Sequence, residues 1–501
     1  MTIDHRETPI STSTESESTD SAPALAPAAH AAAVIRPHLP LAIVLAMSCL
    51  AQFMVVLDST IVSVALPQMR AGLHLSAGQQ QWIVSGYLIT AGGFLLLAAR
   101  AGDLFGRRWV FLFGGVVFTG ASLAGGLATG PAMLLAARIV QGVGAAALAP
   151  TSLSLITVTH TDEARRHRAL ALWSITGGAA GTVGFVLGGV LTAELSWRWV
   201  MFVNVPLGAL LLAASLYSLL PAPVRTRRVK LDLPGALSIT LGMGALTYGL
   251  SQASSDGWRS AGVLTALVAA AVLIAGFVAI EATGSRPLIP LTLFRPRSLR
   301  VGNVLMFCMG MNMTAVQVFI SLYLQEAIGY SALRTGLALV PITVVIIAGG
   351  LASRSLMTSV GRRSLLVLGG LLTAAGTVLL TSAPTHPAYL VHILGPSLVA
   401  GLGISLMLPP ITLTATIGVD PENAGAAAGL LNTSRQIGGA IGLAVLTTIA
   451  ATATTHAARH ASSLDALVHG YHMAFIAGTV FMVVAALAAL ALPAEARKPR
   501  G

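Results

Sequence analysis

Two charged side chains interrupt long apolar stretches of this sequence. Asp58 lies within VVLDSTIVSVALP at 55–67, and no other charged residue occurs between Leu41 and Leu66. Arg138 lies within a second apolar run. An ionised side chain at the centre of a bilayer costs about 2.5–3.5 kcal/mol on insertion scales, so such residues usually pair with each other or serve the function. The pattern therefore favours an intramembrane site that handles protons or a charged substrate group.

The composition indicates that a membrane surrounds most of the chain. Of the 501 residues, 55% are hydrophobic and 9% are charged, whereas about 25% of the residues of soluble proteins are charged. Apolar stretches of about 20 residues, enough to cross a bilayer, recur along the sequence. They predict an all-α polytopic membrane protein with fourteen transmembrane helices, at 41–66, 79–99, 109–128, 132–157, 169–192, 199–220, 233–252, 261–280, 301–325, 335–353, 365–382, 388–415, 424–452 and 470–492.

The helical rise places the two charges at similar depth. Asp58 lies about 12 Å from the outer end of its helix, and Arg138 about 9 Å from the outer end of the helix that begins near 132. We therefore expect both to line one cavity in the outer half of the membrane, close enough to interact. Asp58 either binds protons or substrate or forms a structural ion pair. Arg138 is either its functional partner or a packing group bonded to carbonyl oxygens, beside glycines that let helices approach.

The net charge of +11 reports membrane orientation rather than nucleic-acid binding. Most of the 29 Lys and Arg residues fall in the tails and in alternate loops. Positive charge stays on the cytoplasmic side, so both termini are expected to be cytoplasmic, as an even number of helices requires. The expected partner of the basic loops is the lipid bilayer, and no nucleic-acid partner is expected.

Signatures of enzymes, metals and cofactors are missing from the sequence. There is no GxxxxGK[ST] loop for a nucleotide and no G-x-S-x-G nucleophile turn. The 12 histidines lie mostly in tails and loops and match no metal template. We expect neither an enzyme nor a metal site, and no cofactor other than a proton gradient as energy source.

Two stretches resemble each other and indicate an internal repeat. LAARAGDLFGRRWVFLFGG at 97–115 and LASRSLMTSVGRRSLLVLGG at 351–370 both turn through Gly-Arg-Arg between two helices. Copies in the same orientation are typical of transporters whose substrate binds between two halves. The predicted organisation is a disordered cytoplasmic tail at 1–40, a six-helix half at 41–220, two linker helices at 221–285, a second six-helix half at 286–495 and a cytoplasmic tail at 496–501.

Several motifs in order resemble the fourteen-helix branch of drug:proton antiporters in the major facilitator superfamily. The resemblance covers most of the chain after residue 45. It rests on LDSTIVSVALP at 57–67, GDLFGRR at 102–108, RIVQGVGAAA at 138–147, GFVLGGVL at 184–191, WRWVMFVNVPLG at 197–208, SLYLQEAIGYSALRTGLALVP at 321–341 and AGAAAGLLNTSRQIGGAIGLAVL at 424–446.

The resemblance implies two further groups of functional residues. A cytoplasmic gate would be locked in one state and released in the other by Gly102, Asp103, Gly106, Arg107 and Arg108. The fifth-helix motif of the antiporters would consist of Gly184, Gly188 and Gly189. The chain departs from the family pattern at Leu104, where a basic residue is usual, and at Phe185, where a proline usually follows the glycine. The second departure puts the coupling of transport to protons in doubt.

Arg435 lies near the middle of a later span, about 16 Å from its inner end. It binds an anionic substrate group, a carboxylate from another helix, or backbone carbonyls; the sequence leaves all three open. We expect a monomeric, proton-coupled exporter of small amphipathic compounds by alternating access in the bacterial cytoplasmic membrane, a direction that rests on the resemblance. An uptake symporter or facilitator on the same fold is the alternative, followed by a membrane sensor. Neutral, singly charged or anionic lipophilic compounds suit the few mid-span charges better than dications.

Overall fold

The computed structural model describes residues 41–219, 231–284, 288, 291–385, 387–417, 419 and 424–492, and nearly all of them are helical. The predicted tails at 1–40 and 496–501 lie outside the described residues, as does the loop at 220–230. The predicted domain boundaries remain predictions.

The helices fall into three groups along the chain. The first group is α1 (Leu41–Leu73), α2 (Ala77–Gly93), α3 (Leu95–Phe105), α4 (Arg107–Gly126), α5 (Pro131–Thr159), α6 (Glu163–Glu194), α7 (Arg198–Phe202) and α8 (Asn204–Ser218). A middle pair follows, α9 (Leu233–Asp256) and α10 (Ala261–Thr283). The last group is η1 (Leu291–Phe294), α11 (Arg297–Leu322), η2 (Tyr323–Ala327), α12 (Ala332–Val360), α13 (Arg362–Leu379), η3 (Leu380–Ser382), η4 (Tyr389–Leu394), α14 (Gly395–Thr416), α15 (Ala424–Ala457) and α16 (Ser463–Leu490).

The predicted polytopic helical fold is confirmed. In the described part of the chain, 13 helices are long and apolar enough to cross a membrane, and 14 if α2 and α3, which meet at a bend of 43°, count as one span. Helix ends extend beyond the apolar stretches where polar residues cap them. For example, α6 begins at Glu163 and not at the predicted 169, because the Asp162 side chain accepts a hydrogen bond from the backbone N–H of Arg165 at 2.8 Å.

The repeated Gly-Arg-Arg turns share one backbone conformation. Gly106, before α4, has φ 94° and ψ 133°, and Gly361, before α13, has φ 85° and ψ 149°. A side chain would strain the backbone at these positive φ values, so glycine is favoured at both turns. The similarity between the two stretches is therefore a repeat in structure as well as in sequence.

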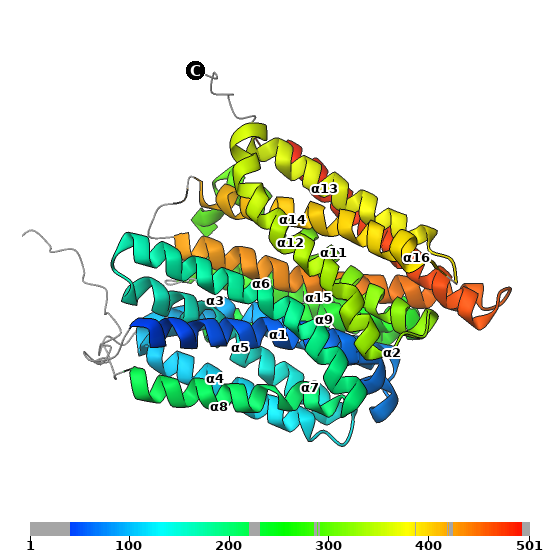
Figure 1. Cartoon of the computed structure of the whole chain (residues 1–501), viewed down its shortest axis with the longest axis horizontal. Helices are drawn as coiled ribbons and strands as arrows, with labels where there is room; N and C mark the ends of the chain where they lie inside the picture. Colours follow the sequence, from blue (N-terminus) through cyan, green and yellow to red (C-terminus); the bar gives the residue numbers. More distant parts are fainter. Residues whose placement is uncertain are drawn as a thin grey trace, which may run out of the picture. The chain divides into compact units, whose positions relative to one another are not determined.

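Helices of the first and last groups meet mainly where α6 packs on α12 and α2 packs on α15. Smaller contacts join α1 to α11 and α12, and α3 to α15. The middle helices α9 and α10 pack on each other, and α9 also contacts α2 and α15. Figure 1 shows the long helices running side by side, with α12 close to α6 at one end and diverging from it toward the other. The first and last groups of helices thus meet along the centre of the bundle.

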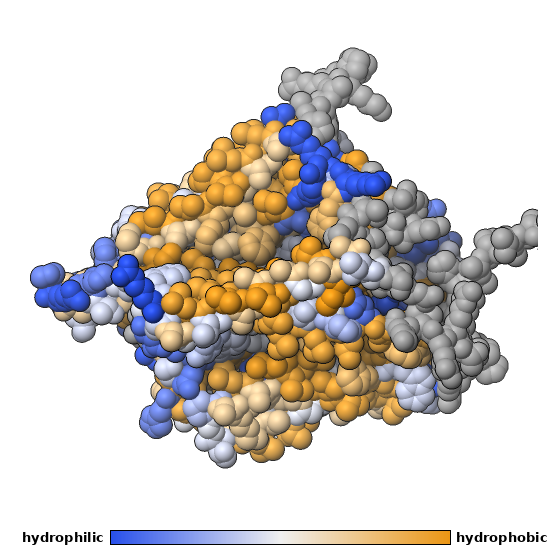
Figure 2. All heavy atoms as spheres, turned by 180° about the vertical axis from the view of Figure 1, so that it is seen from behind, coloured by the Kyte–Doolittle hydropathy of each residue, from blue (hydrophilic) through white to orange (hydrophobic). Residues whose placement is uncertain are grey.

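The two ends of the bundle carry different features. Successive spans alternate in direction, so the turns at Gly106 and Gly361 lie at one end, which we call the arginine end. The opposite end, where α1 leads into α2 and α15 into α16, we call the pocket end. Figure 2 shows a largely hydrophobic surface between hydrophilic patches toward the two ends. Lipid chains can contact such an apolar belt. The helices satisfy their own backbone hydrogen bonds in this region, where lipid offers no partner.

Candidate functional site

The two mid-span charges of the first group of helices form a buried ion pair. Oδ2 of Asp58 in α1 lies 2.6 Å from Nη1 of Arg138 in α5, and the side chains are 0% and 1% exposed. The prediction that these residues lie close enough to interact is confirmed. The prediction that they line a cavity is wrong for this conformation, because the surrounding helices enclose both side chains.

Amide side chains complete the surroundings of Asp58. Its Oδ1 accepts hydrogen bonds from Nε2 of Gln141 at 2.8 Å and from Nδ2 of Asn204 at 3.0 Å. Gln141 also accepts a hydrogen bond from Nη1 of Arg138 at 2.7 Å, so it bridges the two charges. Each of these partners of Asp58 is a donor, an arrangement that suits an ionised carboxylate, which can only accept hydrogen bonds.

Arg138 also ties its helix to α2. Its Nε donates to the carbonyl oxygen of Ile83 at 3.0 Å, and its guanidinium carbon lies 4.5 Å from the centroid of the Tyr87 ring. The Tyr87 hydroxyl donates in turn to the carbonyl oxygen of Val55 in α1 at 3.3 Å. The sequence left two interpretations of Arg138, a partner of Asp58 and a packing group bonded to carbonyl oxygens. The structure shows both kinds of contact, with Asp58 and with the Ile83 carbonyl.

The network continues through Asn204 to α4. Nδ2 of Asn204 lies 3.2 Å from the Ser122 hydroxyl oxygen, and that hydroxyl donates to the carbonyl oxygen of Met201 at 2.7 Å. The Oδ1 atom of Asn204 is buried and has no hydrogen-bond partner among the described residues. A free amide acceptor thus lies on the residue that contacts Asp58, where a protonated carboxyl group would need one.

Sequence reasoning missed four members of this network, namely Tyr87, Ser122, Gln141 and Asn204. Each is a polar residue inside an apolar span, which is a weak signal by itself. Gln141 carried a stronger one, because it follows Arg138 by three positions and residues at that spacing share a helix face.

Two glycines of α5 allow the close helix packing around the site. A Cβ atom on Gly142 would lie 2.5 Å from the carbonyl oxygen of Tyr87 in α2. A Cβ atom on Gly144 would lie 2.5 Å from the backbone nitrogen of Phe118 in α4. Real Cβ contacts are longer, so α5 approaches the backbones of α2 and α4 only because these residues are glycines. Their predicted packing role is confirmed.

The predicted gate residues lie together at the arginine end, where α3 turns into α4. Oδ1 of Asp103 accepts a hydrogen bond from Nη2 of Arg107 at 3.3 Å, so this ion pair stays within the motif. Buried nitrogens of Arg107 and Arg108 have no hydrogen-bond partner in the part of the chain that the structure describes. Gly102 is buried, and Gly106 forms the turn. A gating role of the motif remains a prediction.

The glycines of the fifth-helix motif lie at two helix contacts of α6. Gly184 and Gly188 face α1, where a Cβ atom on Gly188 would lie 2.8 Å from the carbonyl oxygen of Ile61. Gly189 faces α12, where a Cβ atom would lie 2.7 Å from the carbonyl oxygen of Ala332. Without the proline of the family pattern, α6 is continuous across the motif. Its part in proton coupling remains a prediction.

Arg435 lies in α15, and its contacts separate the three alternatives left open by the sequence. Its Nη2 and Nε donate to Oδ1 of Asn432 at 2.8 and 3.3 Å. In the described part of the chain it forms no ion pair with an acidic residue and no hydrogen bond from its side chain to a carbonyl of the backbone. The side chain is half-buried. The structure thus supports neither pairing with a carboxylate nor capture by the backbone.

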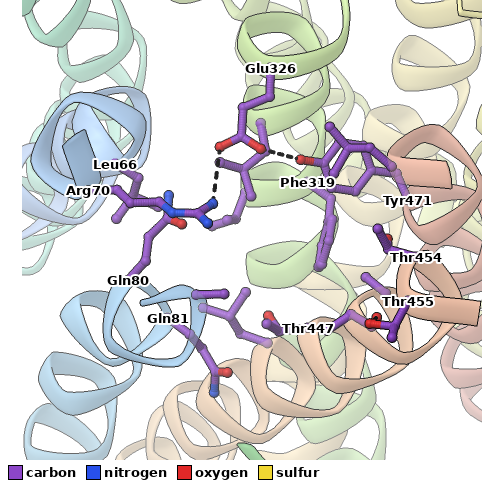
Figure 3. Close-up of a pocket in the computed structure, with 17 residues that line it drawn as sticks. Leu66, Arg70, Gln80, Gln81, Phe319, Glu326, Thr447, Thr454, Thr455 and Tyr471 are labelled. Carbon is purple, nitrogen blue, oxygen red and sulfur yellow. Dashed lines mark hydrogen bonds and ion pairs between the residues drawn. The ribbon is translucent and has the colours of Figure 1, made fainter. Parts of the chain in front are cut away.

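A separate cavity of about 280 Å³ opens at the pocket end between the two groups of helices. Figure 3 shows Arg70 from α1 and Tyr471 from α16 directed toward Glu326. The Tyr471 hydroxyl donates to Oε2 of Glu326 at 2.7 Å, and Nη1 of Arg70 lies 3.8 Å from Oε1. Gln80 and Gln81 of α2 also line this cavity, whereas Asp58 and Arg138 do not.

Comparison with known proteins places this architecture in a family. The model of the family described as Major Facilitator Superfamily matches residues 48–443. The chain belongs to the major facilitator superfamily. Membership makes it a membrane-embedded transporter of small molecules and not an enzyme.

Relatives within the superfamily agree with the predicted branch. The chain is 41% identical to the cephamycin export protein CmcT of Amycolatopsis lactamdurans, with 90% of this chain and 93% of the relative covered. It is 38% identical to the puromycin resistance protein pur8 of Streptomyces alboniger, with 87% and 88% covered. The resemblance to the drug transporters of the superfamily is therefore confirmed.

Solved structures agree with the superfamily fold. The inward open conformation of the xylose transporter XylE from E. coli aligns with a TM-score of 0.61 at 13% identity, covering 91% of this chain and 97% of that one. A bacterial homologue of the human lysosomal transporter Spinster aligns with a TM-score of 0.63 at 16% identity, covering 89% and 95%. These similarities concern the fold alone.

Proposed function

We propose that this major facilitator transporter exports small amphipathic compounds of the antibiotic type, driven by protons that enter the cell. The names of its relatives support export, since they include a cephamycin export protein, a puromycin resistance protein and a tetracenomycin C resistance and export protein. No cofactor takes part besides the proton gradient, and the monomer is the working unit.

The buried network around Asp58 is the observation that supports proton coupling. In this conformation Asp58 accepts hydrogen bonds from Arg138, Gln141 and Asn204, which suits the ionised form. A proton on Asp58 would bring an O–H donor against these donors, so protonation must rearrange the network. Rotation of the Asn204 side-chain amide would place its free acceptor toward that proton. Uptake and release of the proton would thus be linked to a change of helix packing.

The orientation follows from the charges at the two ends. The arginine end faces the cytoplasm, because Lys and Arg are retained on that side of the membrane. Both termini are then cytoplasmic, and the protein lies in the bacterial plasma membrane.

Transport in inverted membrane vesicles tests the proposal. Vesicles carrying the native protein or Asp58→Asn would be energised, a panel of lipophilic antibiotics added, and the internal pH followed. Glu163→Gln is the matched control, since it also removes one carboxylate but from a side chain that is 80% exposed and belongs to none of the candidate sites. We expect substrate-evoked proton release from the native protein and the control, and none from Asp58→Asn.

The other outcomes are distinct. Equal proton release from all three proteins would show that Asp58 does not couple transport to protons. Accumulation of the compounds in right-side-out vesicles instead of inverted ones would replace export with uptake. The comparison of proton release requires that Asp58→Asn reaches the membrane in amounts equal to the native protein, which immunoblotting measures.

A further inference from the structure

Arg435 is a charged side chain near mid-span whose charge no described residue balances. Asp58 is neutralised by Arg138 at 2.6 Å, and Glu326 lies at the pocket end with Arg70 at 3.8 Å. Arg435, by contrast, contacts the neutral amide of Asn432. A cation held inside a membrane protein favours an anion nearby, because the surroundings screen charge poorly.

The hydrogen bonds of Arg435 leave one side of its guanidinium group open. Asn432 accepts from Nε and Nη2, which occupies the edge that these two nitrogens share. No described residue accepts a hydrogen bond from Nη1, so the edge formed by Nη1 and Nη2 remains available. Two parallel N–H groups on such an edge match the two oxygens of a carboxylate. Asn432 holds the group in place, so the open edge is oriented before a ligand arrives.

Arg435 lies where the two groups of helices meet. Two positions before it, the Thr433 hydroxyl donates to the carbonyl oxygen of Gly92 in α2 at 3.1 Å. On the next turn, a Cβ atom on Gly439 would lie 3.3 Å from the Leu88 side chain, also in α2. Arg435 therefore belongs to the part of α15 that packs against α2, at the contact between the halves that alternating access moves.

We propose that Arg435 binds the anionic group of the transported compound, and that the transporter prefers amphipathic carboxylates over neutral compounds of the same size. This assignment rests on the proposed function and names its substrate class. The carboxylate would lie against the open Nη1 and Nη2 edge, and the apolar part of the compound would lie among the side chains between the halves. Arg435 is then a binding residue, distinct from the Asp58 network.

A pair of matched probes tests the charge preference without transport. Pyrenebutyrate is a fluorescent lipophilic carboxylate, and its amide has nearly the same size without the charge. Binding of each to the purified full-length protein in phosphatidylcholine nanodiscs would be measured by fluorescence titration. We expect the acid to bind the native protein about 10- to 100-fold more tightly than the amide, the range for a hydrogen bond to a charged group.

Variants of Arg435 test whether this residue causes the preference for the acid over the amide. Arg435→Gln should lower the affinity for the acid to that for the amide, and Arg435→Lys should keep part of the preference, since it retains the charge but not the two-pronged geometry. Arg334→Gln is the control, because it removes the same charge from an exposed residue at the pocket end and should leave the preference unchanged.

The assignment is overturned if the native protein binds the amide as tightly as the acid, or if Arg435→Gln weakens both probes equally. Should Arg435→Gln fail to fold, the native comparison and Arg435→Lys decide, because a structural arginine predicts no difference between the probes. Acid-selective binding without proton-linked export would refute the proposed function and leave the assignment standing. Proton-linked export of only neutral or cationic compounds would refute the Arg435 assignment and leave the proposed function standing.

Discussion

Replacing Asp58 by Asn should destabilise the protein far more than replacing both partners of the buried pair. The single change leaves the Arg138 guanidinium group enclosed, with 1% exposure and no carboxylate. Breaking a buried ion pair on one side destabilises proteins by about 3–5 kcal/mol, because the remaining charge stays buried. Hydrogen bonds from Arg138 to Gln141 and to the Ile83 carbonyl persist, so we expect a loss near the lower end, about 3 kcal/mol.

The double variant Asp58→Asn with Arg138→Gln removes both charges from the same enclosed space. Neutral groups of similar size often replace buried pairs without loss, and the amide groups can still bond Gln141 and Asn204. We expect the double variant to recover at least half of the stability lost in the single variant. Thermal unfolding in a mild detergent, followed by intrinsic fluorescence at one fixed scan rate, compares the unfolding temperatures of the native protein, the single variant and the double variant.

An exposed pair provides the matched control cycle. Asp103 and Arg107 are four residues apart at the arginine end, with the carboxylate 63% and the arginine side chain 15% exposed. Because water reaches the carboxylate, the pair should contribute less than about 1 kcal/mol, so the same cycle there should show little coupling. The reasoning is refuted if the Asp58 double variant is as unstable as Asp58→Asn alone, because the unbalanced charge would then not be the cause. A stable double variant without transport would separate function from stability.

Three further predictions concern helix packing and the pocket end. Gly144→Ala should lower the unfolding temperature by several degrees, since its Cβ would lie 2.5 Å from a backbone nitrogen of α4, whereas Gly120→Ala, with open space around it, should not. Gly189→Ala should push α6 away from α12, seen as a longer distance between spin labels on the two helices, and Gly181→Ala in the same helix should leave it unchanged. Glu326→Gln should change stability by less than about 1 kcal/mol, because its ion pair is partly exposed; a larger loss in thermal unfolding would contradict this.

Local rules made much of the fold predictable from the sequence. Apolar stretches of sufficient length give spans, and the described residues contain 14 of them when α2 and α3 are joined. The Gly-Arg-Arg repeat identified two equivalent turns, whose glycines share a positive φ. Helix ends were less predictable, because caps such as Asp162 extend a helix beyond the apolar run. A membrane restricts backbone structure so strongly that hydropathy alone identifies most of the elements.

The sequence located Asp58 and Arg138 at similar depth but could not supply their surroundings. Depth follows from a fixed rise per residue within each helix, whereas the face that a residue presents to other helices depends on packing. Asn204 comes from α8 and reaches Asp58 across 146 positions of sequence, a contact that no local pattern indicates. The enclosure of the pair, instead of the predicted cavity, is likewise a result of packing.

By itself the sequence determined the membrane fold, the span count, the repeat and the presence of three charges inside spans. Only the tertiary structure decided how those charges are balanced, because an ion pair requires both the depth and the facing of two helices. It joined Asp58 to Arg138 at 2.6 Å and left Arg435 with a neutral amide partner. Two of the three mid-span charges thus compensate each other within the protein, and the third, Arg435, remains available to a ligand.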